Sequence, residues 1–581
     1  PDTCDTACVD LGMVADTDDD NDGVLDSADA YPLNPNVYQA PTAINASYSI
    51  NLLPRVSNGG TATLTATSQD NRVVTYSLVS NAQYGSITLT DANTGSFVYT
   101  TTNSDTANDY FTFKVNDGYV DSATGRIDIV LNTDPLYKYQ WHLDNTGQTN
   151  FATNAGTVGA DLNVDNAIVD GVTGGGVVVA VVDSGLEIGH EDLVDNVVSN
   201  GSWNYSNLST DPTPTGLGSD HGTKVAGIIA AKGWNNIGGR GVAPNASLKA
   251  FNLISNYSLV NELNALGGDN PLATDVSIFN MSYGGNSYSS VATNTALAWP
   301  SQSLLDQLFN GVTNLRGGYG ALYVNSSGND YFNGSNGTGN LSYCGNGTNS
   351  SNYKISCYDA VFDNIFTSPY IIGVAALDAN NINAQYSTPG ASIWISAYGG
   401  DFGYNTNYAA GGTYPYTNGE VAVPNMPAIT TTDRSTCTNK SSNNEFVDSV
   451  NPHSDNPNCN YTNTMNGTSS AAPMVSGVIA LMLEANNDLY WKDIKHILAS
   501  TAVKVDSNFS ADSINGIDYV GWISNQAGFN FHPWYGFGAI DASAAVSEAL
   551  AWGTQGKVLP SSTLSAWNSS AQGSVSLGEG L

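Results

Sequence analysis

The feature that most constrains the fold of this chain is an apolar run, Val177–Val182, that ends in Asp183. A strand made only of apolar residues is buried on both faces, which is typical of a parallel sheet covered by helices on both sides. In open sheets of this kind, ligands bind at the carboxyl ends of the strands, so Asp183 stands where a functional group is expected. Three later segments have helical periodicity and can supply the covering helices: Val225–Ala231, Ser470–Glu484 and Tyr490–Ala502. We therefore predict an α/β domain, a parallel sheet flanked by helices, over residues 134–550.

The rest of the chain has different patterns. Residues 1–40 are acidic and loop-like, and residues 551–581 are rich in Ser and Gly, which indicates a linker or the start of another domain. Within residues 41–133, apolar and polar residues alternate in Ala62–Thr67, Val73–Leu78, Ser86–Leu89, Ser96–Tyr99, Tyr110–Val115 and Gly125–Val130. Alternating segments at this spacing predict a small antiparallel β-sandwich. The segment Tyr110–Tyr119 is similar to part of bacterial cadherin-like or Ig-like modules, which bind or tether, so we expect a tethering partner.

The charge balance excludes one class of partner. The chain has 17 Lys and Arg against 52 Asp and Glu, a net charge of -35, and nucleic acid would be repelled. No apolar run of about 18 residues is present, so we expect no membrane span.

The cysteines indicate an oxidising compartment. Six cysteines allow 15 pairings in principle, but short loops close most easily. We therefore expect Cys4–Cys8, Cys344–Cys357 and Cys437–Cys459. Disulfides are typical of secreted proteins, so we expect an extracellular, bacterial protein. The chain begins with Pro1 rather than Met, and we expect that a signal peptide preceded it.

Three motifs stand in the order Asp, His, Ser. Asp183 ends the apolar run, His221 begins HGTKVAGIIAA, and Ser469 follows a Gly-Thr turn in NGTSSAAPMVSGVIALML. Singly, such residues are more often structural, capping or packed side chains than catalytic ones. Together they match the order of a serine protease triad, with Ser469 at the positive end of a helix. A fourth segment, ALYVNSSGND, places Asn329 after an apolar strand, where its amide can donate to a developing oxyanion.

On these motifs, residues 134–550 resemble the subtilisin superfamily, and specifically its kexin/furin branch. The resemblance also covers DPLYKYQWHLDNTGQ, RGVAPNASLKAFN and WYGFGAIDASAAV. It implies that Ser282, Tyr283 and Gly284 pair with the substrate backbone. It also implies a calcium site at Asp161, Asp192 and Asn235, completed by the carbonyls of Lys232, Ile237 and Gly239. Two carboxylates, an amide and several carbonyls suit a hard cation.

Several positions depart from the kexin pattern. The acidic residues of that branch are replaced by Ser184, by Gly285-Asn286-Ser287 and by Thr388. These replacements remove a second calcium site and much of the negative field at the first subsite. Asp359 matches a subsite acid, and Asp220 stands beside His221. A basic residue before the cut is therefore compatible with the sequence, whereas strict cleavage after paired basic residues is not expected.

The acidic N-terminal segment contains a calcium-loop pattern. In DDDNDGVLDSAD the acids fall at loop positions 1, 3, 5, 9 and 12, with Gly23 at 6; they are Asp18, Asp20, Asp22, Asp26 and Asp29. No helices flank the loop, so it resembles a thrombospondin type 3-like repeat rather than an EF-hand. The alternative is a disordered acidic linker.

Three functions fit these features. The first is a secreted, calcium-stabilised serine endopeptidase that acts on proteins or peptides through an acyl-enzyme on Ser469. The second is a calcium-dependent binding or adhesion protein with an incidental protease fold, which the sandwich module would suit. The third is a processing protease specific for paired basic residues. The complete set of four motifs favours the first.

Overall fold

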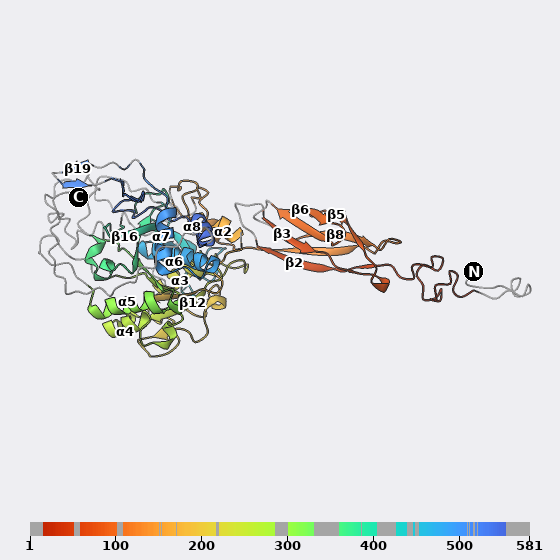
Figure 1. Ribbon diagram of the computed structural model, residues 1–581, viewed down its shortest axis with the longest axis horizontal. Helices are drawn as coiled ribbons and strands as arrows, with labels where there is room; N and C mark the ends of the chain where they lie inside the picture. Colours follow the sequence, from red (N-terminus) through yellow and green to blue (C-terminus); the bar gives the residue numbers. More distant parts are fainter. Residues whose placement is uncertain are drawn as a thin grey trace, which may run out of the picture.

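The computed structural model describes residues 16–553 apart from 52–57, 102–107, 150, 153, 170, 217–219, 285–299, 331–358, 385, 402, 404–425, 438–444, 448–451, 508, 510–511, 515–516 and 520. The β-sandwich lies beside the α/β domain, and the N-terminal segment lies on the far side of the sandwich (Figure 1).

The N-terminal domain is a sandwich of two sheets, as its alternating segments predict. A four-stranded sheet has the order β2-β9-β8-β5, with β2 Ala46–Asn51, β5 Thr75–Ser80, β8 Asp109–Asn116 and β9 Gly125–Asn132. A three-stranded sheet has the order β3-β7-β6, with β3 Asn58–Thr63, β6 Ser86–Asp91 and β7 Ser96–Thr101. The short strands β1 Thr42–Ala43 and β4 Ala66–Thr67 pair separately. One pair, β2 with β9, is parallel, so the sandwich is not wholly antiparallel.

The core of the sandwich is aromatic. Alternate residues of β8 point inward, and Phe111 and Phe113 are fully buried against Phe97 and Ile127. Such burial of large side chains is the main driving force for a small domain.

The second domain is built on a seven-stranded sheet, ordered β11-β12-β10-β13-β14-β15-β16, in which every strand pair is parallel. The strands are β10 Val178–Asp183, β11 Trp203–Asn204, β12 Ser247–Asn252, β13 Ile278–Met281, β14 Leu322–Ser326, β15 Ile371–Leu377 and β16 Ile393–Tyr398. Chain order reverses at β10, because β12 lies on one side of it and β13 on the other. Such a switch point opens a crevice at the carboxyl ends of the strands.

Helices cover both faces of this sheet. They are α2 Asp165–Val169, α3 His221–Ala230, α4 Leu259–Ala265, α5 Gln302–Asn314, α6 Thr468–Ala485, α7 Trp491–Thr501 and α8 Ala542–Ala551. In β10, Val179 and Val181 join the core with α3, α6 and α8, whereas Ala180 and Val182 join the core with α5. The strand is therefore buried on both faces, as its apolar sequence predicts.

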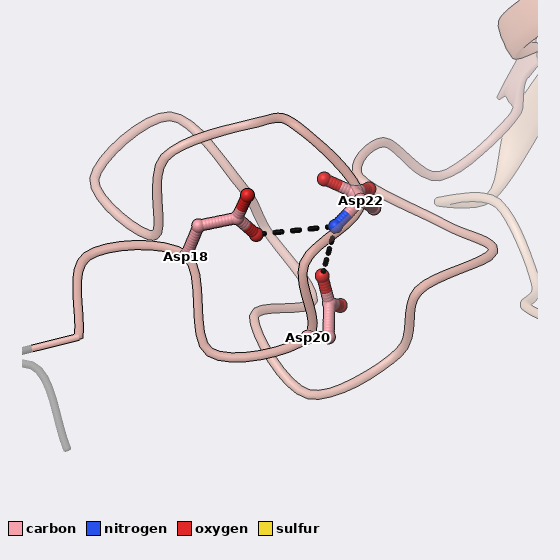
Figure 2. Close-up of side chains that lie close together, drawn as sticks. All are labelled: Asp18, Asp20 and Asp22. Carbon is pink, nitrogen blue, oxygen red and sulfur yellow. Dashed lines mark hydrogen bonds between the residues drawn. The ribbon is translucent and has the colours of Figure 1, made fainter.

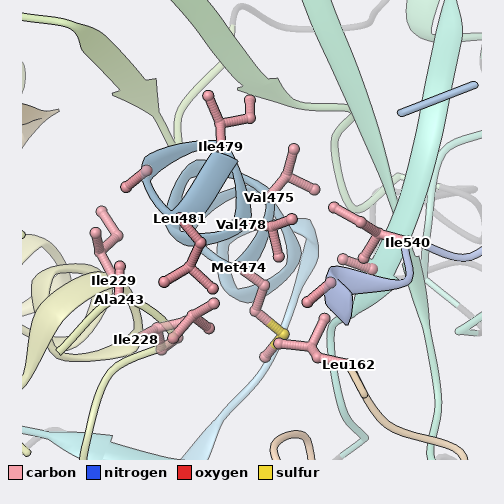
Figure 3. Packing of buried hydrophobic residues seen from close by; sticks show 14 of the residues in the cluster. Leu162, Ile228, Ile229, Ala243, Met474, Val475, Val478, Ile479, Leu481 and Ile540 are labelled. Carbon is pink, nitrogen blue, oxygen red and sulfur yellow. The ribbon is translucent and has the colours of Figure 1, made fainter. Parts of the chain in front are cut away.

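Helix α6 is the centre of the larger core. Figure 3 shows its side chains packed against α3 and against Leu162 and Ile540. By length and composition alone, α6 could cross a membrane, although the sequence predicts no membrane span. Because 83% of that window is buried inside the domain, we interpret α6 as a core helix.

Smaller elements connect this framework. Three antiparallel pairs join β17 Ile429–Thr432 to β18 Tyr461–Met465, β19 Asp512–Ile514 to β20 Ile517–Tyr519, and β21 Ile523–Ser524 to β22 Asn530–Phe531. The 3₁₀ turns are η1 Gln69–Asn71, η2 Tyr137–Tyr139, η3 Val194–Asn196, η4 Ile254–Asn256, η5 Pro271–Ala273, η7 Arg316–Gly318, η8 Ala360–Phe362, η9 Asn364–Thr367 and η11 Glu445–Val447.

One of the expected disulfides is present in the part of the chain that the structure describes. Cys437 and Cys459 are bonded, and the bond closes a loop next to a small core around Phe446. Cys4, Cys8, Cys344 and Cys357 lie outside the described residues.

Candidate active site

Asp183 and His221 form a hydrogen-bonded pair at the carboxyl end of β10. Asp183 is the last residue of the strand and is fully buried, and His221 is the first residue of α3. The imidazole Nδ1 lies 2.9 Å from each carboxylate oxygen of Asp183. The helix can approach this closely because residue 222 is glycine: a Cβ there would lie 2.0 Å from the Gly185 carbonyl oxygen. The Gly of the HGT motif is thus required by packing.

The pair sets the basicity of His221. Burial by itself lowers the pKa of His221, but the charge of Asp183 and its hydrogen bond together outweigh burial and raise that pKa above its ordinary value. With Nδ1 held by a carboxylate, Nε2 is the ring nitrogen left to exchange a proton with a substrate or nucleophile.

Ser469 is the second residue of α6 and is largely buried. Its hydroxyl donates to the Ser282 carbonyl at 3.2 Å, and among the described contacts it makes no hydrogen bond with His221. Catalytic hydrogen bonds are often unformed without substrate, so this geometry does not argue against a nucleophile.

Proline at position 473 explains a second contact between these segments. Pro473 has no N–H to donate to the Ser469 carbonyl one turn earlier in α6. The Ser282 hydroxyl donates to that carbonyl instead, at 3.2 Å. Ser282 in turn accepts a hydrogen bond from Asn280, at 3.0 Å. The end of β13 is thereby joined to the first turn of α6.

Asn329 stands beside the start of α6. Its side-chain oxygen accepts hydrogen bonds from the Thr468 N–H, at 2.9 Å, and from the Thr468 hydroxyl, at 3.0 Å. Its amide nitrogen faces the turn before Ser469, because a Cβ on Gly467 would lie 3.0 Å from it. With the oxygen occupied by Thr468, the NH₂ group is oriented as a donor toward the start of α6.

The three residues expected to pair with substrate follow β13. The Ser282 side chain is buried and used internally, as above, and Gly284 is exposed. The Tyr283 hydroxyl donates to Glu262 at 3.4 Å. A Cβ on Gly284 would lie 2.6 Å from a carboxylate oxygen of Asp363. Sequence reasoning missed both of these acids, because nothing in the local sequence places them beside this segment.

The predicted subsite acids lie elsewhere. Asp359 caps η8 by accepting from the Val361 N–H at 3.0 Å, and burial raises the pKa of Asp359. No described contact joins Asp359 to residues 282–284. Asp220 is paired with Lys224, at 3.0 Å, so its charge is already compensated.

The structure places one predicted calcium ligand away from the others. Asp192 and Asn235 are joined by a 2.8 Å hydrogen bond, and the Lys232 N–H donates to the Asp192 carbonyl. Asp161 instead accepts N–H groups of Asn145 and Asn163, and it lines a separate cavity of about 250 Å³ with Asp541 and Tyr398. The predicted set of calcium ligands is therefore corrected: Asp161 lies apart from Asp192 and Asn235.

The carboxylate that does lie near Asp192 is Asp134. Asp134 accepts from the Trp234 N–H, and its charge acts on Asp192. Burial raises the pKa of Asp134 to about 7 and that of Asp192 to about 8. One Asp192 oxygen is buried without a hydrogen-bond partner. Two buried carboxylates and an unpartnered oxygen fit a bound cation. No local sequence signal marks Asp134 as a ligand, because tertiary packing brings it to Asp192.

The N-terminal loop has the same character. Carboxylate oxygens of Asp18, Asp20 and Asp22 lie within 4.8 Å of one another (Figure 2). One oxygen each of Asp20, Asp26 and Asp29 is buried and lacks a hydrogen-bond partner. Burial and then the charges of Asp22, Asp29 and Asp18 raise the pKa of Asp20. Gly23 adopts φ 97°, as the sharp turn of a calcium loop requires. These residues also fit a cation.

An Asp–His pair and a serine at a helix N-terminus, placed by a parallel sheet, are the arrangement of a serine hydrolase. The chain belongs to the subtilase family, which its residues 174–538 match. Residues 38–130 match the bacterial Ig domain.

Curated relatives are proteases. The chain is 36% identical over 442 residues to the extracellular serine protease of Aeromonas sobria, in an alignment covering 72% of this chain and 64% of that protein. It is 29% identical to kexin of Saccharomyces cerevisiae, over 72% of this chain and 40% of kexin. It is 30% identical to neuroendocrine convertase 2 of Rattus norvegicus, over 75% and 55%. The chain thus spans less than two thirds of each of these relatives.

Solved structures agree. A crystal structure of the Aeromonas sobria serine protease matches with a TM-score of 0.59 and 35% identity, covering 72% of this chain and 68% of that one. The same protease in complex with a chaperone matches with a TM-score of 0.59 and 33% identity, covering 72% and 67%.

Proposed function

We propose that this chain is a serine endopeptidase that hydrolyses peptide bonds through an acyl-enzyme on Ser469. The observation that carries the proposal is the Asp183–His221 pair, in which the imidazole Nδ1 lies 2.9 Å from the carboxylate. The pair lies at the carboxyl end of β10, and the Ser469 hydroxyl donates to the carbonyl of Ser282, which follows the neighbouring strand β13. The match of residues 174–538 to the subtilase family supports the same roles.

The proposed steps follow from these positions. His221 Nε2 takes the Ser469 proton as the hydroxyl attacks the scissile carbonyl carbon, and Asp183 stabilises the imidazolium that forms. The NH₂ group of Asn329 donates to the oxyanion, together with the backbone N–H of Ser469. His221 then gives its proton to the leaving amine. Water enters, and His221 takes one of its protons as the water oxygen attacks the acyl carbon. His221 then returns that proton to the Ser469 oxygen as the bond between this oxygen and the acyl carbon breaks, which releases the carboxylic acid and restores the hydroxyl.

The substrate backbone would lie along Ser282, Tyr283 and Gly284, which supplies affinity with little sequence choice. We propose a preference for a basic residue before the cut. Asp359 is the acid predicted from sequence to bind it, and Asp363 and Glu262 lie beside the substrate-pairing residues 282–284. The likeness to a relative from Yarrowia lipolytica that is named a dibasic-processing endoprotease supports a basic preference. Cleavage-site profiling of wild type and Asp359→Asn tests this: unchanged preference in the variant would exclude Asp359.

Calcium is the proposed structural cofactor. In the α/β domain, Asp134, Asp192 and the Asn235 side chain would hold it with the carbonyls of Lys232, Ile237 and Gly239. In the N-terminal loop, the ligands would be Asp18, Asp20, Asp22, Asp26 and Asp29. A bound cation supplies positive charge that lets these buried carboxylates ionise.

We also propose that the protein is secreted by a bacterium and acts on proteins or peptides. We propose disulfides between Cys4 and Cys8 and between Cys344 and Cys357. The Ig-like domain would bind a tethering partner. The Aeromonas extracellular protease and the bacterial Ig domain support this location.

Casein hydrolysis by wild type and Ser469→Ala tests the proposed activity. We expect the variant to lose at least about a thousandfold in rate, because the nucleophile is gone. Tyr398→Phe, which removes a buried hydroxyl away from the site, is the control for folding. Equal hydrolysis by wild type and Ser469→Ala, or none by either, would contradict the proposal and favour a binding protein with an incidental protease fold.

A further inference from the structure

The turn that presents Ser469 is held by a tyrosine hydroxyl. Gly467, two residues before Ser469, donates its N–H to the Tyr386 hydroxyl at 2.9 Å. That hydroxyl donates in turn to the Gly400 carbonyl at 2.6 Å. Gly467 has φ 102° and precedes the first turn of α6. Its carbonyl accepts from the Ser470 N–H at 2.9 Å, but its own N–H lies outside the helix and depends on Tyr386. The fit is close, because a Cβ on Gly399 would lie 2.6 Å from the Tyr386 oxygen.

The loop that presents Asn329 is held from the same segment. Thr388 donates its N–H to the Gly328 carbonyl at 3.0 Å, and its hydroxyl accepts from the Asp330 N–H at 3.0 Å. These bonds flank Asn329 on both sides, and Thr388 is fully buried. Gly328 also donates to the Thr468 hydroxyl at 3.1 Å, which ties the same loop to the start of α6.

The residue between them is anchored to the sheet. The Ser387 hydroxyl accepts from the Ala376 N–H, in β15, at 2.9 Å. Residues 386–388 therefore have a fixed base on β15 and two hydroxyls that reach different loops.

We propose that Tyr386 and Thr388 are positioning residues that hold the nucleophile turn and the oxyanion-donor loop at a fixed separation. The proposal rests on the proposed function, since the roles of Ser469 and Asn329 come from it. Neither hydroxyl needs to touch substrate. An error of about 1 Å in the separation of nucleophile and donor can cost on the order of a hundredfold in rate, so a modest loss of anchoring is measurable.

Tyr386→Phe and Thr388→Val delete one hydroxyl each and keep the side-chain shape. We expect kcat to fall about tenfold in each variant while KM changes less than about twofold, because placement of the reacting groups changes and ground-state binding does not. Thr388→Ser, which keeps the hydroxyl, should restore kcat.

Two controls separate positioning from general destabilisation. Tyr323→Phe deletes a buried hydroxyl that donates to the Leu266 carbonyl, and Tyr398→Phe deletes a buried hydroxyl that lies within hydrogen-bond distance of the Asp161 carbonyl and the Asn381 side-chain oxygen. Both should lower the thermal midpoint without lowering kcat. If they lower kcat as much as Tyr386→Phe and Thr388→Val do, or if those two variants keep the wild-type kcat, the proposal is overturned.

A double-mutant cycle assigns the path of the effect. In an Asn329→Ala background, Thr388→Val should cost little more, because the donor that it positions is already missing, whereas Tyr386→Phe should still cost about tenfold. A further tenfold loss from Thr388→Val in that background would overturn the role of Thr388. Failure of the proposed function looks different: Ser469→Ala would then match wild type before any of these variants is compared.

Discussion

Two fully buried carboxylates in the α/β domain, Asp183 and Asp192, have opposite surroundings. Asp183 accepts hydrogen bonds from His221 and from the Ser184 N–H, so the chain itself satisfies it. Asp192 lies near the like charges of Asp134 and Glu191 and keeps one oxygen without a partner. Buried charges without partners are costly, so the second environment requires something that the chain does not supply. The comparison separates a catalytic group, whose partner is a proton carrier, from a group that calls for a cation.

The largest effect should come from neutralising the satisfied carboxylate. Asp183→Asn should lower kcat by about 10⁴-fold, because an amide favours the wrong tautomer of His221 and cannot stabilise imidazolium. The pH profile checks the cause. His221 must be neutral to act as a base, so activity falls as pH drops through its pKa. Without the Asp183 charge that raises this pKa, the acidic limb should move to lower pH. Asp192→Asn is the matched control, and a similar loss of kcat in it at saturating calcium would break the distinction.

A smaller effect, on stability rather than rate, should come from removing calcium. Chelation should lower the thermal midpoint. If calcium was present at about 100 times its Kd, its removal should lower the free energy of unfolding by about 2.7 kcal/mol. Asp134→Asn and Asp192→Asn should abolish the difference between calcium and chelator in the thermal midpoint of the α/β domain, because the N-terminal loop keeps its own ligands. A thermal midpoint that stays the same when the chelator is added would contradict the proposed calcium site.

The chelated protein should also respond to pH in a defined direction. Asp134 and Asp192 have pKa values raised to about 7 and about 8 in the folded protein, above about 3.9 in an unfolded chain. The folded state therefore binds more protons between these values, and stability falls as pH rises from about 4 to about 8. Calcium should remove this dependence, since it replaces the protons. Unfolding curves at a series of pH values, with and without calcium, measure it.

The smallest effect should come from the N-terminal loop. Asp29→Asn should remove one bound calcium, measured by titration calorimetry, and leave casein hydrolysis unchanged, because the loop lies beyond the sandwich from the α/β domain (Figure 1). Asp16→Asn, an exposed acid outside the loop spacing, should keep the stoichiometry. Equal stoichiometry in both variants would argue for the acidic linker that is the alternative to a calcium loop.

Sequence predicted the groups that neighbouring residues specify and missed those that tertiary contacts specify. Val177–Val182 implied a strand buried on both faces, and the HGT and GTS motifs marked helix starts whose small residues allow close packing. The starts of α3 and α6 came earlier than periodicity alone predicted, because polar first-turn residues carry no apolar signal.

The predicted calcium ligands show what sequence alone could not place. Local sequence does not distinguish Asp134 from Asp161 as a ligand. Only the packing of residues 134–145 against the segment after α3 brings Asp134 to Asp192. The same holds for Asp220, which its partner Lys224 neutralises, and for Glu262 and Asp363, which reach the Ser282–Gly284 segment from other elements.

The most direct test of the central claim is to identify the residue that an active-site-directed fluorophosphonate labels. The reagent phosphonylates a serine only where a base activates it and donors stabilise the adduct. Peptide mass spectrometry of the labelled protein should place a single adduct on Ser469, and Asp183→Asn should react far more slowly. An adduct on another residue, or casein hydrolysis with Ser469 unlabelled, would contradict the account.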